Sequence, residues 1–163
     1  MATETSDIDV LVVLEPTRRV TRATYLECLD LARDYLKRSR VRLAALDVLF
    51  DGESWPDVVR ESQEVVELTL KALLRASGVD APRIHDLAPI LRAERARFPE
   101  PLAPYIDELA DASRQLRRDR ELAFYGAEDL TPGEFYTRAD AERALAYARR
   151  VVDLVAGHVP GMR

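Results

Sequence analysis

The feature that most constrains the fold is a run of regularly spaced, mostly apolar residues between positions 25 and 50. Its members are separated by four and three residues in alternation, and they are Tyr25, Leu29, Ala32, Leu36, Ser39, Leu43, Leu46 and Phe50. Residues at this spacing lie on one face of an α-helix. Because no Gly or Pro interrupts the run, the sequence predicts one long amphipathic helix that needs neighbouring helices to bury this face.

Turn and capping residues divide the next part of the chain. The segment DGESWPD predicts the end of the first helix and the start of a second at the N-cap Ser54. Pro56 falls in the first turn, and Asp57 is at the position that closes a capping box with Ser54. Gly78 is typical of a helix end, so the second helix is expected to stop there.

Three more helices are predicted after residue 80. A short one spans HDLAPILRAERARF and is expected to be capped by His85 or Asp86, and a longer one runs from about residue 102 to about residue 123. The last begins at a capping box from Thr137 to Asp140, after an expected loop with the sequence YGAEDLTPGEFY. Short connections between amphipathic helices predict an all-α fold, an antiparallel up-and-down bundle of four main helices plus one short helix.

Length and composition indicate the number of domains and the class of protein. A length of 163 residues with 47% hydrophobic residues suits one domain, for which we expect residues 17–163. Residues 1–16 are expected to be an extended N-terminal segment, because SDIDVLVVLEP is typical of a strand and no second strand pattern follows. No apolar run predicts a signal peptide or a membrane span, so we expect a cytoplasmic protein that does not bind membranes.

Cysteine, histidine and net charge exclude other classes of site. The single cysteine, Cys28, cannot form an internal disulfide and is expected to be a small core residue. No spacing of Cys and His predicts a tetrahedral metal site, and we expect no cofactor. A net charge of −5 argues against a general electrostatic grip on duplex DNA, although a local basic patch could still bind a phosphate.

Such a patch is present in RQLRRDRELAFYG, residues 114–126, whose basic members are Arg114, Arg117, Arg118 and Arg120. Arg120 lies four residues after Leu116 and so continues the apolar stripe of its helix. A charge at such a position needs a partner. Two interpretations remain open: ion pairs within the chain, such as Arg117 with Glu121, or a dimer cleft in which Arg120 meets phosphate or a carboxylate of the other subunit.

Single aromatic and histidine side chains each have two interpretations. Phe124 and Tyr125 either close the core at the end of a helix or stack on the bases of single-stranded RNA. Trp55, which follows an N-cap, is expected to cover the core. His85 is expected to be a capping residue rather than a catalytic one, because it lies at a helix start.

The segment DVVRESQEVVELTLKALLRASGVDAPRIHDLAPIL and the later RRDRELAFYG resemble HEPN domains, a helical family of prokaryotic toxins and nucleotide-binding proteins. The resemblance covers about residues 20–157. It implies an up-and-down bundle that usually dimerises. It also implies, for the active members, metal-independent RNase activity from a motif of Arg, four to six residues, and His at the end of the fourth helix.

The arginine of that motif is present here, but the histidine is not. Tyr125 occupies its place, after four residues from Arg120 and after six from Arg118, and the chain's histidines are His85 and His158. A tyrosine with an ordinary pKa of about 10 is a poor base at pH 7. The sequence therefore favours a binding or degenerate site over an efficient nuclease.

The N-terminal SDIDVLVV resembles the Asp-x-Asp strand of minimal nucleotidyltransferases, which are frequent partners of HEPN proteins. Asp7 and Asp9 would share one side of a strand, which makes them candidates for a divalent metal site. The Gly-Ser turn of those enzymes is missing before Asp7, so we interpret the segment as a vestige or a misassigned start.

Three hypotheses follow. The first is a dimeric HEPN-type module with a degenerate RNase motif that pairs with a nucleotidyltransferase as in toxin-antitoxin systems and binds nucleotide or RNA phosphate. Its binding residues would be Arg117, Arg118, Arg120 and Tyr125. The second is an active metal-independent endoribonuclease in which another group replaces the histidine. The third is a purely structural helical adaptor.

Overall fold

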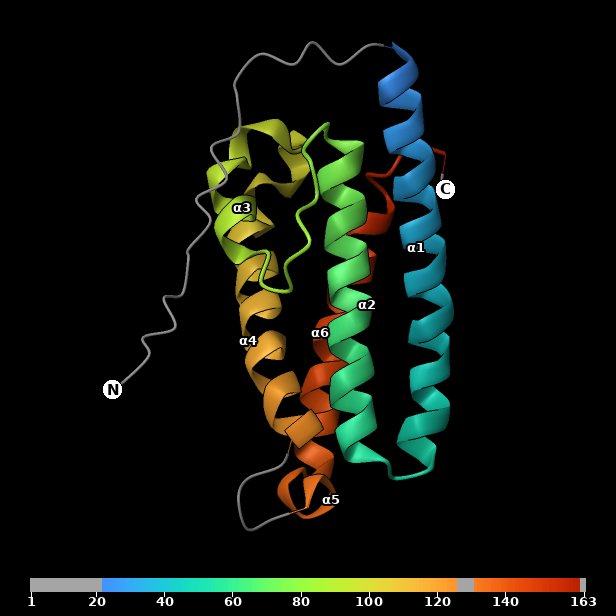
Figure 1. Ribbon diagram of the computed structural model, residues 1–163, viewed down its shortest axis with the longest axis vertical. Helices are drawn as coiled ribbons and strands as arrows, with labels where there is room; N and C mark the ends of the chain where they lie inside the picture. Colours follow the sequence, from blue (N-terminus) through green and yellow to red (C-terminus); the bar gives the residue numbers. More distant parts are fainter. Residues whose placement is uncertain (1–21, 126–130, 162–163) are drawn as a thin grey trace, which may run out of the picture.

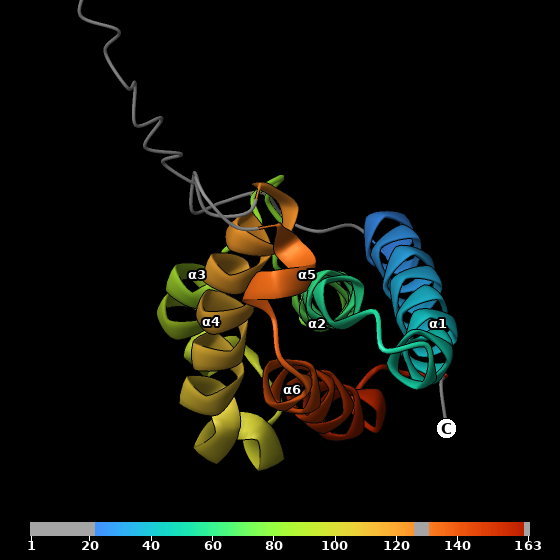
Figure 2. The ribbon, with the colours of Figure 1, turned by 90° about the horizontal axis from the view of Figure 1, so that it is seen from below.

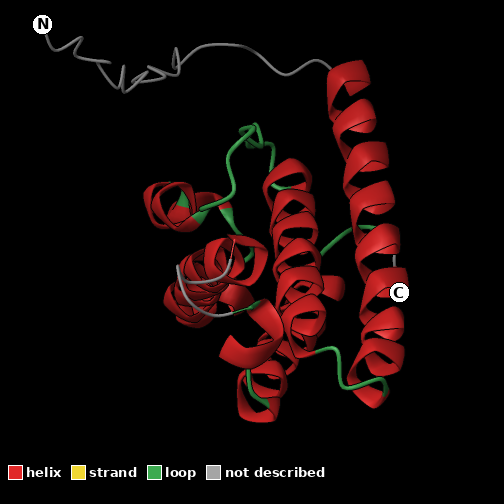
Figure 3. Cartoon of the chain, turned by 60° about the horizontal axis from the view of Figure 1, so that its bottom comes forward, coloured by secondary structure: helices red, strands yellow, loops and turns green. Residues whose placement is uncertain are grey.

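The computed structural model describes residues 22–125 and 131–161, and the side chains of residues 22–24, 120–125 and 132 are outside that description. Among the described residues the regular structure is helical, without a strand (Figure 3). The α-helices are α1 (Arg22–Asp51), α2 (Trp55–Ala76), α3 (Ala88–Ala93), α4 (Ile106–Tyr125), α5 (Pro132–Phe135) and α6 (Arg138–Ala156), and the 3₁₀ helices are η1 (Arg95–Arg97) and η2 (Glu100–Tyr105).

The four long helices run alternately down and up, which confirms the predicted antiparallel bundle (Figure 1). Helix α2 lies at the centre and packs against α1, α4 and α6 (Figure 2). This position explains why α2 is buried on more than one side. Its residues that are inaccessible to solvent include Val58, Val65, Leu70, Leu73 and Leu74. Each of the other long helices buries one stripe against it.

Helix α1 forms one edge of the bundle and confirms the opening prediction. Leu36 and Ser39, in the middle of the predicted face, are fully buried, whereas Tyr25 at its start is 40% exposed. The opposite side of α1 faces away from the bundle, and Val48 there is 73% exposed. Cys28 lies between these faces and is half-buried, so its prediction as a core residue is wrong.

Helix boundaries follow most of the sequence signals. Gly78 adopts a positive φ of 70° at the end of α2, and Thr137 and Asp140 form the predicted capping box of α6. Ser54 is the N-cap residue of α2, but its hydroxyl donates to Asp57 Oδ2 at 2.6 Å and caps no backbone N–H. The predicted capping box at this helix is therefore wrong, although the boundary is right.

The third helix is shorter than predicted, and its start differs. Helix α3 has only six residues, with Leu87 as N-cap, and the chain continues through η1. The Asp86 carboxylate accepts the Ala88 N–H at 2.9 Å, as a residue at a helix start does. Of the two residues expected at this helix start, Asp86 makes such a bond, and the His85 ring turns to Glu67 of α2. The segment expected to be a loop before α6 contains the short α5.

Proline explains the entry into α4. The predicted start near residue 102 falls in the 3₁₀ helix η2, which contains Pro104, and the α-helix proper begins at Ile106. A proline lacks the N–H that an α-helical hydrogen bond requires. Trp55 packs against the core at the start of α2, with its ring edge-on to Phe50, as expected for a covering residue.

Within residues 22–125 and 131–161, no helix combines the length and the apolar content that a bilayer-spanning helix requires. Residues 1–16, with the predicted strand and the candidate metal ligands Asp7 and Asp9, lie outside the described residues.

Candidate functional site

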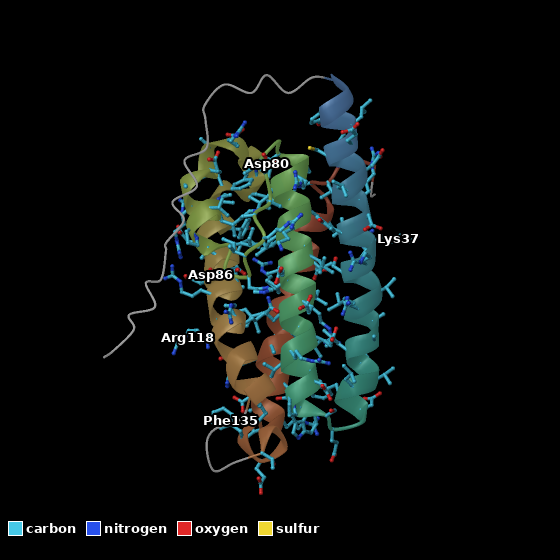
Figure 4. The ribbon with its side chains drawn as sticks, viewed as in Figure 1. Lys37, Asp80, Asp86, Arg118 and Phe135 are labelled. Carbon is cyan, nitrogen blue, oxygen red and sulfur yellow. The ribbon has the colours of Figure 1, made fainter. Side chains whose placement is uncertain are left out.

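The arginine-rich segment lies on the second half of α4. Leu109 and Leu116 are buried, which confirms the predicted apolar stripe as far as Leu116. Arg114 and Arg118 are exposed, and Figure 4 shows the Arg118 side chain directed away from the bundle. Arg117 is half-buried on a neighbouring side of the helix.

Two of the predicted site residues are on α4 but cannot be placed further. The side chains of Arg120 and Tyr125 lie outside the described residues, as do those of Phe124 and Glu121. Their predicted roles in binding, stacking or pairing with Arg117 therefore stay predictions.

A cluster of polar groups holds this part of α4 against the start of α6. The Tyr136 hydroxyl donates to the backbone carbonyl of Asp119, and burial raises the pKa of Tyr136 to about 12, helped by the charges of Asp119 and Asp140. Burial also raises the pKa of the Asp119 carboxyl, against the effect of a hydrogen bond from Gln115. These contacts fix the orientation of the helix that carries the arginines.

A second group of polar side chains lies between α2 and α4, and we call it the polar seam. Its members are Gln63, Glu67 and Lys71 of α2, His85 of the following loop, and Ser113 of α4. The Glu67 carboxylate is at its centre and is only 8% exposed. Its Oε1 accepts from Lys71 Nζ at 2.6 Å, and its Oε2 accepts from Gln63 Nε2 at 2.8 Å and lies 2.8 Å from His85 Nδ1.

The charge of Glu67 determines how the histidine ring is oriented. Burial alone would raise the pKa of this carboxyl, but hydrogen bonds from Lys71, His85 and Gln63 outweigh burial and hold the pKa below its ordinary value. Glu67 is therefore ionised near neutral pH and can only accept hydrogen bonds. His85 Nδ1 must then be the donor, so that in the neutral ring the proton is on Nδ1 and Nε2 is an acceptor.

Ser113 connects this seam to the arginine helix. Its Oγ accepts the buried Leu87 N–H at 3.0 Å, which fixes the loop two residues after His85 onto α4. Figure 4 shows Asp86, the residue between them in the chain, next to α4. Arg117 follows Ser113 by four residues, and residues at this spacing lie on the same side of a helix one turn apart. The seam and the arginine segment are therefore neighbours.

The sequence contained a signal for this seam that its apolar pattern obscured. Gln63, Glu67 and Lys71 recur every four residues, which places three polar groups in one row along an otherwise apolar helix. Such a row within a central helix indicates buried polar contacts. No group of three or more potential metal ligands occurs among the described residues.

Comparison with known proteins identifies related sequences. A family model described as the HEPN domain matches residues 32–158, a span that includes the polar seam and all of α4. A curated protein named "Putative toxin MJ1304", from Methanocaldococcus jannaschii, is 28% identical over 130 residues, covering 76% of this chain and 85% of that protein. No solved structure matches the chain.

Proposed function

The chain belongs to the HEPN domain family, and on this premise we propose that it is a dimeric helical module that binds a nucleotide or RNA phosphate and pairs with a minimal nucleotidyltransferase. The predicted resemblance to this family is confirmed by the match over residues 32–158. The relative named as a toxin supports a toxin-like role, in which the nucleotidyltransferase is the antitoxin-like partner.

The observation that carries the proposal is the position of the arginines on α4. Arg114 and Arg118 are exposed on a helix whose other side is anchored by buried Leu116. Arg117 is half-buried and lies one helical turn after Ser113 of the polar seam. Guanidinium groups are planar, permanently charged donors that suit phosphate oxygens. With Arg120 and Tyr125 they form the proposed phosphate site.

The motif at the end of α4 supports binding more than cleavage. Arg120 and Tyr125 stand where active family members have arginine and histidine, and neither side chain readily takes a proton at pH 7. Tyr125 can stack on a base or donate one hydrogen bond. We therefore propose that this motif holds the ligand without itself transferring protons.

A homodimer is part of the proposal because Arg120 extends the apolar stripe of α4 beyond Leu116, past the point where one bundle needs it. Light scattering of the purified chain at tens of micromolar is expected to give twice the mass of 18.4 kDa. A monomer mass would contradict the dimer. Co-purification with a co-expressed minimal nucleotidyltransferase tests the partner separately.

Phosphate binding is tested by fluorescence anisotropy with a labelled single-stranded RNA and, in parallel, a labelled nucleoside triphosphate. Arg118→Ala is expected to raise the Kd about tenfold, the effect of losing one charge-assisted hydrogen bond. Arg138→Ala is the matched control, because Arg138 is an exposed arginine of α6 that pairs with Glu142 at 2.9 Å. Equal effects of the two variants, or no binding by the wild type, would favour the purely structural adaptor.

A further inference from the structure

We propose that the outer face of α1 is a self-association surface, on which a second copy of this chain packs its own α1 in the antiparallel direction. The inference goes beyond the proposed function, because this face belongs to α1 and not to the helix that carries the arginines. Helix α1 packs against α2 and α6, and Figure 2 shows its other side directed away from the bundle.

The outer face carries a row of residues that repeats with the spacing of a coiled coil, and we call it the outer row. Its members are separated by three and four residues in alternation, and they are Leu31, Asp34, Arg38, Val41, Ala45 and Val48. All six are exposed, and Val41 and Val48 are 64% and 73% exposed. Single apolar residues are ordinary on a protein surface, but a heptad row is the pattern by which two helices pack.

The order of chemical types in the outer row is self-complementary. Its first four residues are apolar, acidic, basic and apolar, namely Leu31, Asp34, Arg38 and Val41. Two copies of this row can meet in antiparallel directions, with the two-fold axis midway between Asp34 and Arg38. Leu31 then lies opposite Val41 of the second copy, and Asp34 lies opposite its Arg38. Such a contact matches apolar with apolar and each charge with its opposite.

A shift of one copy by a heptad removes this match. In one direction, Arg38 would face Val41 of the second copy and Asp34 would face its Ala45. In the other direction, Leu31 would face Asp34. A charge opposite an apolar residue loses water without gaining a partner. The register that pairs the charges is therefore favoured.

A shallow hollow in the outer row supports the same register. It has a volume of about 300 Å³ and is lined by Asp34, Lys37, Arg38, Val41 and Arg42. The first four are spaced as the residues that form a hole for one side chain of the facing helix in a coiled coil. Because three of the five lining side chains are cationic, the hollow suits a carboxylate. In the register above, that carboxylate is Asp34 of the second copy.

The ion pair within one chain leaves both charged groups accessible. Asp34 Oδ2 lies 3.9 Å from Arg38 Nη1, which is longer than a hydrogen bond, and the two side chains are 57% and 51% exposed. Their side chains can therefore bind a second copy without leaving a buried position.

The contact is expected to be weak, because it is one helix wide and has charges at its centre. Small interfaces are typical of transient complexes, and polar residues within a coiled-coil seam fix the register at the expense of stability. We therefore expect it to join copies only at hundreds of micromolar, above the concentration at which the proposed dimer forms.

The experiment is analytical ultracentrifugation of the full chain from tens to hundreds of micromolar. The mass of the wild type is expected to rise with concentration beyond twice 18.4 kDa. Asp34→Arg places arginines opposite each other across the contact, and Arg38→Asp places carboxylates opposite each other. Each variant is expected to raise the Kd of this step at least about tenfold, because like charges then meet.

Mixing the two variants is the decisive measurement. In a mixture of Asp34→Arg with Arg38→Asp, each altered residue again faces an opposite charge, so association is expected to return to the wild-type level. Arg138→Asp is the matched control, because Arg138 also pairs with a carboxylate four residues away, Glu142, on an exposed helix side outside the outer row. Melting followed by circular dichroism confirms that each variant folds.

Oxidative crosslinking tests the register in a Cys28→Ala background. Leu31→Cys mixed with Val41→Cys is expected to give a disulfide between the two chains. Leu31→Cys alone should give none, because the two equal residues would lie about 15 Å apart along the helices, too far for a disulfide.

The outcomes separate this inference from the proposed function. A wild type that stays at two copies at every concentration, or a mixture that does not regain association, would overturn the α1 surface and leave the proposed function standing. A monomeric Asp34→Arg at tens of micromolar would show that α1 forms the dimer itself, which overturns the argument for the dimer from Arg120. A wild type that is monomeric throughout would overturn both contacts.

Discussion

Two clusters of charge join α4 to the rest of the bundle, and they differ in burial more than in bonding. In the polar seam, Glu67 accepts from side chains of α2 and the following loop and is 8% exposed. On the outer side of α4, Asp107 accepts from Arg92 at 3.2 Å and also from Arg95, but its side chain is 58% exposed. We call this second cluster the surface ladder; its members are Arg92, Arg95, Asp107 and Asp111.

The comparison shows that the number of hydrogen bonds to a carboxylate does not measure its contribution to the stability of the fold. Hydrogen bonds from cationic donors lower the pKa of Glu67 and of Asp107 alike. At the surface, however, water and salt screen the charges and replace lost partners. In the interior, a lost partner leaves a charge that water cannot reach. The two clusters should therefore respond very differently to the same mutation.

The largest effect is expected for Glu67→Ala. This change leaves the Lys71 ammonium, whose side chain is only 16% exposed, without its anion. We expect the free energy of unfolding to fall by about 3 kcal/mol, as when one partner of a buried ion pair is removed. Urea unfolding followed by circular dichroism measures it. A loss below about 1 kcal/mol would mean that the seam behaves like an exposed pair.

Lowering the pH gives a second test of whether the charge of Glu67 stabilises the fold. The folded-state pKa of Glu67 lies below its ordinary value of 4.5, so the stabilisation by its charge is fully present above pH 4.5 and is lost as pH falls through the folded pKa. The stability advantage of the wild type over Glu67→Gln should therefore shrink as the pH falls below 4.5. An advantage independent of pH would show that packing, not charge, is the cause.

The next largest effect is expected for Ser113→Ala, which breaks the link between the seam and α4. The Leu87 N–H, at a fully buried residue, would lose its acceptor, and a buried unpaired donor costs about 2 kcal/mol. Ser39→Ala is the matched control, because the Ser39 hydroxyl is equally buried but only donates to the Leu36 carbonyl of its own helix. If the two variants lose equal stability, the loop is not held by Ser113.

The helices themselves could be predicted from the sequence, whereas the contacts of the polar seam could not. The face of α1 around Leu36, the stop at Gly78 and the capping box at Thr137 depend on residues close together in the chain, and all three were predicted. The pairing of His85 with Glu67 joins residues 18 positions apart across a loop. No local pattern encodes it, because it depends on how the loop lies against α4.

The residues of the candidate site could likewise be read from the sequence, but their contacts with distant residues could not. The arginine content of α4 and the missing histidine can be read directly, so Arg117 and Arg118 were placed on the correct helix. The contact of His85 with Glu67 was not predicted, because a histidine before a helix carries the same local signal whether it caps the helix or turns to another one. The roles of Arg120 and Tyr125 stay predictions.

A smaller effect is expected for Tyr136→Phe, which removes a hydroxyl that donates to the backbone carbonyl of Asp119 on α4. The loss at pH 7 should be about 1 kcal/mol, the net value of one neutral hydrogen bond. The pKa of Tyr136 is raised from 10.0 to about 12, so its stabilisation is complete below pH 10 and lost between pH 10 and pH 12. Urea titrations at pH 8 and pH 11 should show the two proteins converging at the higher pH.

The smallest effect is expected for Asp107→Asn in the surface ladder. The substitution keeps the size of the side chain and removes the charge that faces Arg92 and Arg95. Because the side chain is 58% exposed, water replaces the lost contacts, and Arg92 keeps Asp111 at 2.7 Å. The melting temperature should stay within about 2 °C of the wild type at 0.15 M salt, and the small difference should vanish at 1 M salt. A loss as large as that of Glu67→Ala, or one that salt does not reduce, would show that the ladder is a structural element of the bundle and that exposure is the wrong criterion for separating the two clusters.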